Sequence, residues 1–225
     1  MAANPILDQQ IIDDPHMKPL EWHKARQNYI GASEVGAILG LNPWKSRLEV
    51  YLEKVADEPV IIGMNERMRW GLIHEAVIAS EFCRRTGLKV QQWSKGYTSK
   101  EFPFLRASAD RLIIGSEKGT GILEIKTANG FYAKSWEHEV PLMYYAQLML
   151  QMYCSCHDWG AITVLIDGNE LHTHWYSRDE DFLAAAVPQL VDFWKNHVEK
   201  RIPPEPQNGE DVQKLYAASL PGKFV

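Results

Sequence analysis

The feature that most constrains the fold is a pair of opposite charges inside a short apolar run, GILEIKT, at residues 121–127. In an extended strand alternate side chains share a face, so Glu124 and Lys126 lie together and Ile125 faces the other way. A second apolar run, ASADRLIIG, contains Asp110 just before its apolar part. The pattern predicts two neighbouring strands that carry charged side chains to one place.

These residue types suit a magnesium site. Mg²⁺ binds oxygen, usually through one or two protein carboxylates, and leaves its other positions to water and phosphate. Asp110 and Glu124 would supply the carboxylates, and two ions could hold the attacking and leaving oxygens of a displacement at phosphorus. Lys126 would lie beside the water and the phosphate, where a cation orients the nucleophile and stabilises developing charge.

A simpler interpretation stays open at this point. Glu-x-Lys is expected about once by chance in a chain of this length, and the run could be an edge strand with a surface ion pair and an Asp at a turn. Two further polar residues favour a site. Glu75 lies between Gly71 and Ile78 on a fairly apolar helix face, and Gln147 lies inside the apolar helix YYAQLMLQMY. Glu75 could equally be a surface residue at the edge of the stripe, and a buried amide such as Gln147 needs a partner in either case.

Arg26 and Ser33 form a second candidate cluster. Ser33 is expected at a helix N-terminus, where free backbone N–H groups and the helix dipole favour an anion. An arginine just upstream could complete a pocket for a terminal phosphate by bidentate contact. The alternative is an ordinary N-cap serine and a surface arginine.

Composition excludes several classes of protein. The net charge of -5 and the pI near 5.9 argue against a loose polyanion binder with a generally basic surface. No apolar run reaches the length of a membrane span, and the N-terminus lacks the features of a secretory signal, so a cytosolic protein without membrane contact is expected. Three cysteines without a CxxC pair argue against a disulfide or Cys-rich metal framework.

The patterning predicts one domain over 1–225, of α/β or α+β class. The N-terminus (1–18) is expected to be mobile, and the Pro-rich tail (201–225) to pack along the surface or to be partly mobile. Helices are expected near 19–31, 33–40, 46–57 and 66–85, followed by three or four strands within 88–127. A further helix is expected over 141–156, and then a hairpin over 161–177 with Asp167–Gly168 as its turn. The last helix is expected to begin near Ser177 and to run to about Lys200, with a kink or break at Pro188. The helix over 66–85 is expected to have an apolar stripe of Met68, Leu72, Ala76, Ala79 and Cys83.

Taken in order, these motifs resemble those of the phage lambda exonuclease group, the YqaJ-type viral recombinases of the PD-(D/E)xK nuclease superfamily. The similarity runs from about Trp22 to Trp194. WHKARQNYIGASE resembles the opening motif, which implies that Arg26 and Ser33 contact a 5′-phosphate. WGLIHE resembles the motif that contributes a glutamate, here Glu75, which would bind a second metal ion or position the water.

ASADRLI and LEIKT resemble the Asp and Glu-x-Lys motifs. This implies Asp110, Glu124 and the carbonyl of Ile125 as metal ligands and Lys126 as the catalytic lysine. PLMYYAQLMLQMY resembles the closing helix, which implies Gln147 and, with less support, Tyr144. Ala109 stands in place of the family proline, and the loop NPWKS departs from the lambda-like version, so DNA contacts by Trp44, Lys45 and Arg47 are the least supported.

The resemblance implies a central mixed sheet flanked by helices, with a restriction-endonuclease-like core. It implies a Mg²⁺-dependent 5′-to-3′ exonuclease on double-stranded DNA, using two ions that Mn²⁺ could replace, that releases mononucleotides and leaves 3′ overhangs for recombination by single-strand annealing. It also implies double-stranded DNA ends and a single-strand annealing protein as partners, a ring-shaped homotrimer, and a phage or prophage origin in a bacterial host.

Two alternatives remain. A structure-specific or restriction-type endonuclease could use the same core and would cut a closed circle. A non-catalytic DNA-binding module would show no Mg²⁺-dependent turnover. The iron–sulfur branch of related nucleases needs four cysteines, and this chain has three.

Overall fold

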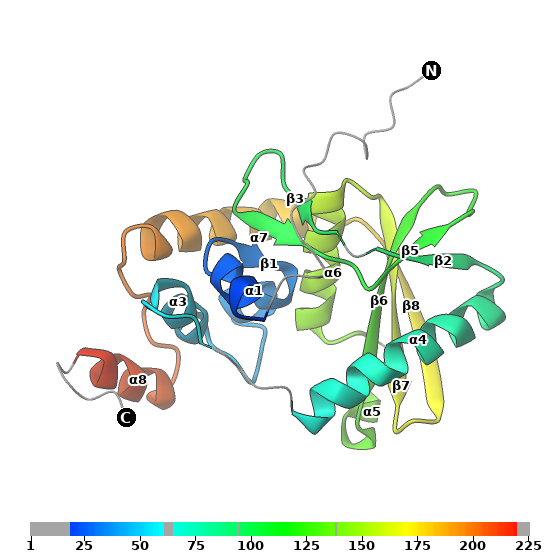
Figure 1. Cartoon of the computed structure of the whole chain (residues 1–225), viewed down its shortest axis with the longest axis horizontal. Coiled ribbons are helices and arrows are strands. Elements are labelled where there is room, and N and C mark those ends of the chain that lie inside the picture. The colour runs from blue at the N-terminus through cyan, green and yellow to red at the C-terminus, as the bar shows by residue number, and fades with distance from the viewer. Residues whose placement is uncertain (1–18, 61–64, 94, 138, 220–225) are drawn as a thin grey trace.

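The computed structural model describes residues 19–60, 65–93, 95–137 and 139–219, and it is organised around a five-stranded mixed sheet (Figure 1). The expected mobility of residues 1–18 lies outside the described residues. The described helices are α1 (Pro19–Arg26), η2 (Ala32–Glu34), α2 (Val35–Ile38), α3 (Arg47–Val55), α4 (Glu66–Thr86), η3 (Gly130–Tyr132), α5 (Ala133–Glu137), α6 (Leu142–Ser155), α7 (Glu180–Asp192), η4 (Phe193–Val198) and α8 (Gly209–Ser219). None of these helices is both long enough and apolar enough to cross a membrane.

The described strands are β1 (Ile30–Gly31), β2 (Lys89–Gln92), β3 (Tyr97–Thr98), β4 (Leu105–Ala107), β5 (Arg111–Ile114), β6 (Gly121–Ala128), β7 (Trp159–Ile166) and β8 (Glu170–Ser177). The large sheet has the order β2-β5-β6-β7-β8, in which only β6 and β7 are parallel. A parallel pair needs a crossover, and η3, α5 and α6 provide it. The predicted α/β fold with a central mixed sheet flanked by helices is confirmed.

The expected number of strands was too low. The described chain forms five strands between Lys89 and Ala128, where three or four were expected. Two of them, β3 and β4, are only two and three residues long and join β1 in a separate small sheet. Strands this short carry too little alternation to be detected from sequence.

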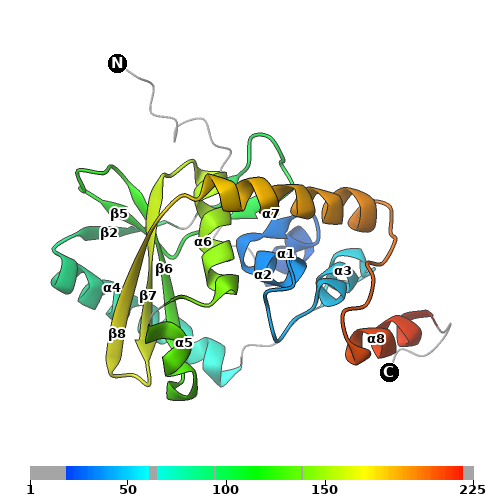
Figure 2. The same cartoon turned by 180° about the vertical axis from the view of Figure 1, so that it is seen from behind.

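The two faces of the large sheet are covered by different helices. Ile122 of β6 and Ile162 of β7 belong to the core that α6 closes, whereas Leu123 and Ile125 pack with Ile78 of α4 on the opposite face. Figures 1 and 2 view these two sides, with α4 in front of the strands in Figure 1 and behind them in Figure 2. Alternate side chains of β6 are therefore buried on opposite faces of the sheet, because neither face is left to solvent.

Helix α4 follows its predicted apolar stripe only towards the C-terminal end, where Ala79 is buried and Cys83 packs against the core. Its buried residues are Ile78, Ala79 and Phe82, while Met68 and Leu72 are exposed. Only the C-terminal half of this helix buries side chains against the sheet. The helix bounds were close to the prediction, with Gly87 in the left-handed conformation after the last turn.

The predicted hairpin and its turn are confirmed. β7 and β8 are antiparallel, and Asp167 and Gly168 both have positive φ, of 50° and 77°. Such angles are required at both central residues of a type I′ turn, which explains the Asp-Gly sequence. The Asp167 carboxylate also accepts a hydrogen bond of 2.7 Å from the N–H of Gly130 and so ties the turn to the end of β6.

The last long helix starts and continues differently from the prediction. Asp179, not Ser177, caps α7, since its side chain accepts from the N–H of Phe182. Pro188 lies inside α7 without breaking it, and helical structure continues through η4 to Val198. Pro188 is exposed, so water can satisfy the carbonyl that loses its helical partner.

Part of the Pro-rich tail is an ordered helix. Within α8, Asp211 is buried and accepts a hydrogen bond of 2.6 Å from Ser46 Oγ at the start of α3. Lys214 pairs with Glu49, also at 2.6 Å. These contacts hold α8 on α3, at the end of the molecule far from the large sheet (Figure 1), so the described part of the tail packs on the surface.

A steric test of the contact between α2 and α6 uses Gly36. A Cβ at this position would lie 2.7 Å from Cβ of Met143, which is closer than real carbon contacts allow. We expect Gly36→Ala to lower the free energy of unfolding by about 1–3 kcal/mol, as overpacking does, measured by urea denaturation. Gly209→Ala is the control, since its Cβ would meet nothing within 4 Å. Equal midpoints for Gly36→Ala and the parent chain would contradict the tight packing.

Candidate active site

Asp110 directly precedes β5, at the point where β6 continues beyond its pairing with that strand. β5 begins at Arg111, which pairs with Leu123, so among the described strands the remainder of β6 has only β7 beside it. Oδ2 of Asp110 accepts a hydrogen bond of 2.7 Å from the N–H of Ile125. The carboxylate thus takes the place of the missing strand carbonyl, which positions it next to Glu124.

Glu124 is the centre of the cluster and is only 3% exposed. Its Oε1 accepts hydrogen bonds from Lys126 Nζ at 2.5 Å and from Gln147 Nε2 at 2.6 Å. Lys126 Nζ also lies 3.3 Å from Gln147 Oε1. The predicted meeting of Glu124, Lys126 and Gln147 is therefore present in the structure, with α6 supplying the amide from the face opposite α4.

Gln151 belongs to the same cluster, although sequence reasoning did not select it. Its Nε2 donates to Glu124 Oε2 at 2.6 Å and to the carbonyl of Ser108 at 2.8 Å. Its own Oε1 is buried and has no hydrogen-bond partner. The available signal was the spacing, since residues four apart on a helix lie on one face and Gln147 and Gln151 are four apart.

Glu75 reaches the cluster from α4 but is paired with Arg111, a residue that sequence reasoning also missed. Arg111 Nη1 donates to Glu75 Oε1 and, at 2.5 Å, to the carbonyl of Asp110. The structure therefore brings Glu75 to the cluster, where its carboxylate is already neutralised by a guanidinium. The signal for Arg111 was its position directly after Asp110.

The electrostatics of the cluster show an excess of negative charge. Burial, and then the neighbouring Glu124 carboxylate, raise the pKa of Asp110 to about 8, although Lys126 and the N–H of Ile125 oppose the rise. Burial alone would lower the pKa of Lys126, but Glu124 and Asp110 outweigh it, and the pKa lies above its usual value. A bound cation would relieve this repulsion between the two carboxylates.

The residues fit one Mg²⁺. Hard oxygen donors suit this ion, and it commonly uses only one or two protein carboxylates. Asp110 and Glu124 would hold it, with the Ile125 carbonyl as the further ligand implied by the resemblance. Across the described part of the chain, no group of three or more His, Cys, Asp or Glu side chains could hold a metal ion. A second ion at Glu75 stays a prediction, because Glu75 is engaged by Arg111.

A cavity of about 70 Å³ lies at the second candidate cluster and extends to Gln147, which contacts Glu124 of the first. Arg26 and Ser33 line one part of it, and Gln147 and Ser108 line another. Arg26 Nη2 donates to Ser33 Oγ at 3.4 Å, so the structure brings these two predicted residues together. The short helix η2 begins at Ala32, one residue before Ser33, whose exposed side chain lies in the first turn.

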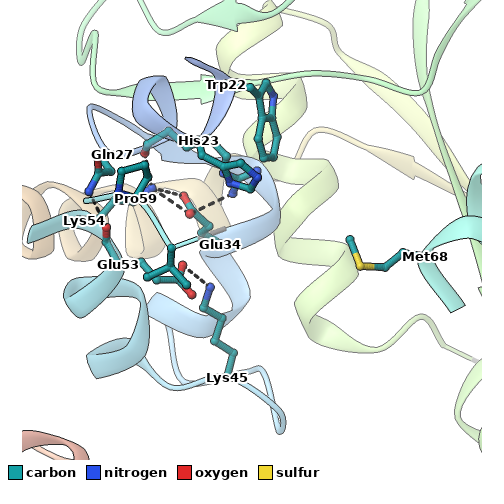
Figure 3. A pocket seen from close by; sticks show the side chains of 11 residues that line it. Trp22, His23, Gln27, Glu34, Lys45, Glu53, Lys54, Pro59 and Met68 are labelled. Carbon is teal, nitrogen blue, oxygen red and sulfur yellow. Dashed lines mark hydrogen bonds and ion pairs between the residues drawn. The ribbon is translucent and has the colours of Figure 1, made fainter. Parts of the chain in front are cut away.

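Arg26 is held by a buried ion pair. Glu34 lies 2.9 Å from Arg26 Nη2, and both Glu34 oxygens accept from Lys54 Nζ at 2.8 Å. Figure 3 shows Glu34 and Lys54 beside Gln27, in a separate pocket of about 280 Å³ that Met68 of α4 also lines. Lys54 also donates to the carbonyl of Arg26 at 2.6 Å, so its three donors are all used. Burial would raise the pKa of Glu34, but Lys54 and Arg26 hold it below its usual value.

Tyr144 lies near the carboxylate cluster, and Trp44 lies in the same groove as Tyr144. The Tyr144 ring centroid is 4.9 Å from Lys126 Nζ. Both residues line a groove of about 460 Å³ with Trp70 and Arg67 of α4. The structure therefore brings Tyr144 to the cluster, and a DNA contact for Tyr144 or Trp44 stays an untested prediction.

Lys45 and Arg47 are not brought to the cluster. Lys45 pairs with Glu53 of α3 at 2.6 Å. Arg47 pairs with Asp192 at 3.5 Å, and its guanidinium carbon lies 5.4 Å from the ring centroid of Phe193. Arg47 thus packs towards the end of α7, and a DNA contact for it stays an untested prediction.

Comparison with known proteins gives a family match. The family model described as the YqaJ-like viral recombinase domain matches residues 21–158. The uncharacterized protein YqaJ of Bacillus subtilis (strain 168) is 32% identical over 181 residues, which is 79% of this chain and 56% of that protein. Protein D345L of African swine fever virus is 31% identical over 80 residues, 33% of this chain and 22% of that protein. The chain spans only about half, or less, of the length of these relatives.

Solved structures share the fold. The alkaline exonuclease LHK-Exo of Laribacter hongkongensis is similar with a TM-score of 0.67 and 20% identity, over 88% of this chain and 98% of that one. Its complex with dAMP gives the same TM-score with 21% identity over the same shares. A phage-related exonuclease of Haemophilus somnus 129PT has a TM-score of 0.59 and 12% identity, over 80% and 98%. The shared fold extends over nearly the full length of these structures.

Gln151 offers a test of the support under Glu124. Gln151→Met keeps the side-chain volume but removes the amide that donates to Glu124 and Ser108. We expect Mg²⁺ affinity to fall about tenfold or more, as for other groups that orient metal ligands, measured by titration calorimetry. Gln189→Met is the control, because this exposed glutamine donates within its own helix. Unchanged affinity in Gln151→Met would show that Glu124 needs no support from this amide.

Glu34 offers a test of the buried ion pair. Glu34→Gln leaves Lys54 buried without its counter-charge and should lower the free energy of unfolding at pH 7 by about 3 kcal/mol or more. The pKa of Glu34 in the folded chain lies below its ordinary value of 4.5. The stabilisation is therefore complete above about pH 4.5 and is lost as the pH falls through the folded pKa. Denaturation series from pH 7 to pH 3 should show the gap between parent and variant narrowing, whereas the exposed control Glu117→Gln should show no gap.

Proposed function

The chain belongs to the YqaJ-like viral recombinase domain family, and we propose that it is a Mg²⁺-dependent 5′-to-3′ exonuclease on double-stranded DNA. It would start at a 5′-phosphate, release mononucleotides and leave 3′ overhangs for phage-type recombination by single-strand annealing. One observation carries the proposal: Gln147, which donates to Glu124 of the Asp110–Glu124–Lys126 cluster, lines the same cavity as Arg26 and Ser33. The exonuclease fold of the similar structures adds support.

The roles follow from the contacts. A bound Mg²⁺ would polarise the scissile phosphate and lower the pKa of a water molecule. Asp110, Glu124 and the Ile125 carbonyl would hold the ion. Lys126 donates to Glu124 and reaches Gln147. It would also donate a hydrogen bond to the attacking water or to a phosphate oxygen. Gln147 and Gln151 would keep Glu124 oriented, so that its buried charge faces the reacting groups.

The cavity supplies a reason why hydrolysis would occur near the end of the DNA strand. A terminal phosphate at Arg26 and Ser33 would be held by charge-assisted hydrogen bonds. Gln147 lines the same cavity and donates to Glu124. An end bound in this way would bring a phosphodiester bond close to the end beside the carboxylates, and the product would be a mononucleotide.

The proposal extends to assembly and partners. A ring-shaped homotrimer around DNA would reconcile the net charge of -5 with DNA binding, since only the inner surface need be basic. Exposed apolar side chains of α4 are available for contacts between copies or with DNA: Met68, Trp70, Leu72, Ile73 and Val77. Sedimentation equilibrium should give three times the chain mass of 25.8 kDa. A single-strand annealing protein would be the partner that uses the overhang.

The direct test uses linear duplex with 5′-phosphate or 5′-hydroxyl ends and Mg²⁺. The phosphorylated strand should be lost from its 5′ end as mononucleotides, and Mn²⁺ should also support the reaction. Lys126→Ala and Asp110→Ala should each reduce the rate by about a hundredfold or more, with circular dichroism unchanged. Lys195→Ala is the control, because this exposed lysine contacts Glu199 and the Phe104 ring and no residue of the carboxylate cluster.

Other outcomes would assign another function. Rapid cutting of a covalently closed circle would identify an endonuclease on the same core. Binding without Mg²⁺-dependent turnover would indicate a non-catalytic DNA-binding module. Near-normal rates in Lys126→Ala would show that the carboxylate cluster is not the active site.

A further inference from the structure

Arg106 of β4 faces the cavity that Arg26 and Ser33 line. It belongs to none of the sequence motifs, and none of the proposed roles is assigned to it. It lines that cavity, and its guanidinium carbon lies 4.8 Å from the ring centroid of Tyr29. Arg26 is held similarly, 4.9 Å from the ring centroid of Trp22. An arginine that stacks on an aromatic ring is pre-organised, so it loses little freedom when it binds an anion.

The small sheet directs Arg106 to the side of β1 on which Arg26 of α1 lies. Gly31 of β1 and Arg106 of β4 are register partners in a parallel pair, so their side-chain directions are on the same face. A Cβ at Gly31 would lie 3.4 Å from Arg26 Nη2. Glycine therefore leaves the space in which the guanidinium of Arg26 lies next to the position of Arg106.

The charges around this space do not cancel. Glu34 is shared by Arg26 and Lys54, and all three donors of the Lys54 ammonium are used. Within the described residues, Arg106 forms no ion pair with a carboxylate. Among the described residues that line the cavity, Arg26 and Arg106 are the two cations and none is a carboxylate. A terminal phosphate monoester carries close to two negative charges at neutral pH, whereas an internal phosphodiester carries one.

We propose that Arg106 is the specificity-determining residue that makes this cavity select a terminal phosphate monoester over a phosphodiester or a hydroxyl end. Arg26 and Ser33 would bind any phosphate oxygen, and Arg106 would supply the second positive charge that only a dianion can match. This inference rests on the proposed function, since it concerns the end of the same DNA strand. It adds a selectivity that Arg26, already paired with Glu34, does not provide alone.

The experiment measures binding without turnover. Fluorescence anisotropy in EDTA would compare three hairpin duplexes with a single open end, carrying a 5′-phosphate, a 5′-phosphate methyl ester or a 5′-hydroxyl. The parent chain should prefer the phosphate over the methyl ester. Arg106→Gln should lose about tenfold or more in affinity for the phosphate end, as expected for a lost charge-assisted hydrogen bond, and should change little for the other two ends.

Two further variants make the test specific. Arg106→Lys keeps the charge without the bidentate geometry and should retain part of the preference. Arg84→Gln removes an exposed arginine that pairs with Glu81 on α4 and should leave all three affinities unchanged. Circular dichroism and the unfolding midpoint would confirm that each variant is folded.

The outcomes separate the two proposals. If Arg106→Gln binds all three ends like the parent, or weakens all three equally, Arg106 does not select the monoester and the inference is overturned. If the parent prefers the phosphate end and Arg106→Gln loses that preference, the inference holds. The nuclease assay with Mg²⁺ is read independently, so absent cleavage would reject the exonuclease while leaving the phosphate selectivity in place.

Discussion

The buried carboxylate of Glu124 is the group on which the rest of the site depends. A charge that is only 3% exposed is tolerated because Lys126 compensates it and Gln147 and Gln151 complete its hydrogen bonds. The two amides lie on α6, the helix that also fills the core on that side of the sheet with Leu148 and other apolar residues. The position of the helix in the core and the geometry of the carboxylate are therefore set by the same contacts.

In the second cluster, Glu34 is likewise a buried carboxylate whose charge is compensated by its neighbours. It is buried, shared between Lys54 and Arg26, and accepts a third contact from the N–H of Gly31. The two buried carboxylates differ in the sign of the excess charge around them. At Glu124 and Asp110 the negative charge is in excess and suits a cation, whereas around Glu34 the positive charge is in excess and suits an anion. Gln147 links the two clusters, since it donates to Glu124 and lines the cavity of Arg26.

Much of this site could be predicted from particular residues. Strand alternation placed Glu124 and Lys126 on one face, and an amide within an apolar helix indicated that Gln147 has a polar partner. Asp110 was selected because it precedes an apolar run. Glu75 was correctly placed near the cluster, but its pairing with Arg111 was not foreseen, because the two residues are 36 positions apart and lie on different elements. No local pattern carries that information.

The sequence by itself determined the bounds of α4 and α6, the Asp167–Gly168 turn and the strand that bears the charged pair, because these follow from local periodicity and backbone preference. Only the tertiary structure decided which face of α4 is buried, that Asp110 replaces a strand carbonyl at Ile125, and that Arg106 stands beside Arg26. These facts depend on strand register and on which elements pack together. Register is set by contacts between distant parts of the chain, so it cannot be derived from any one segment.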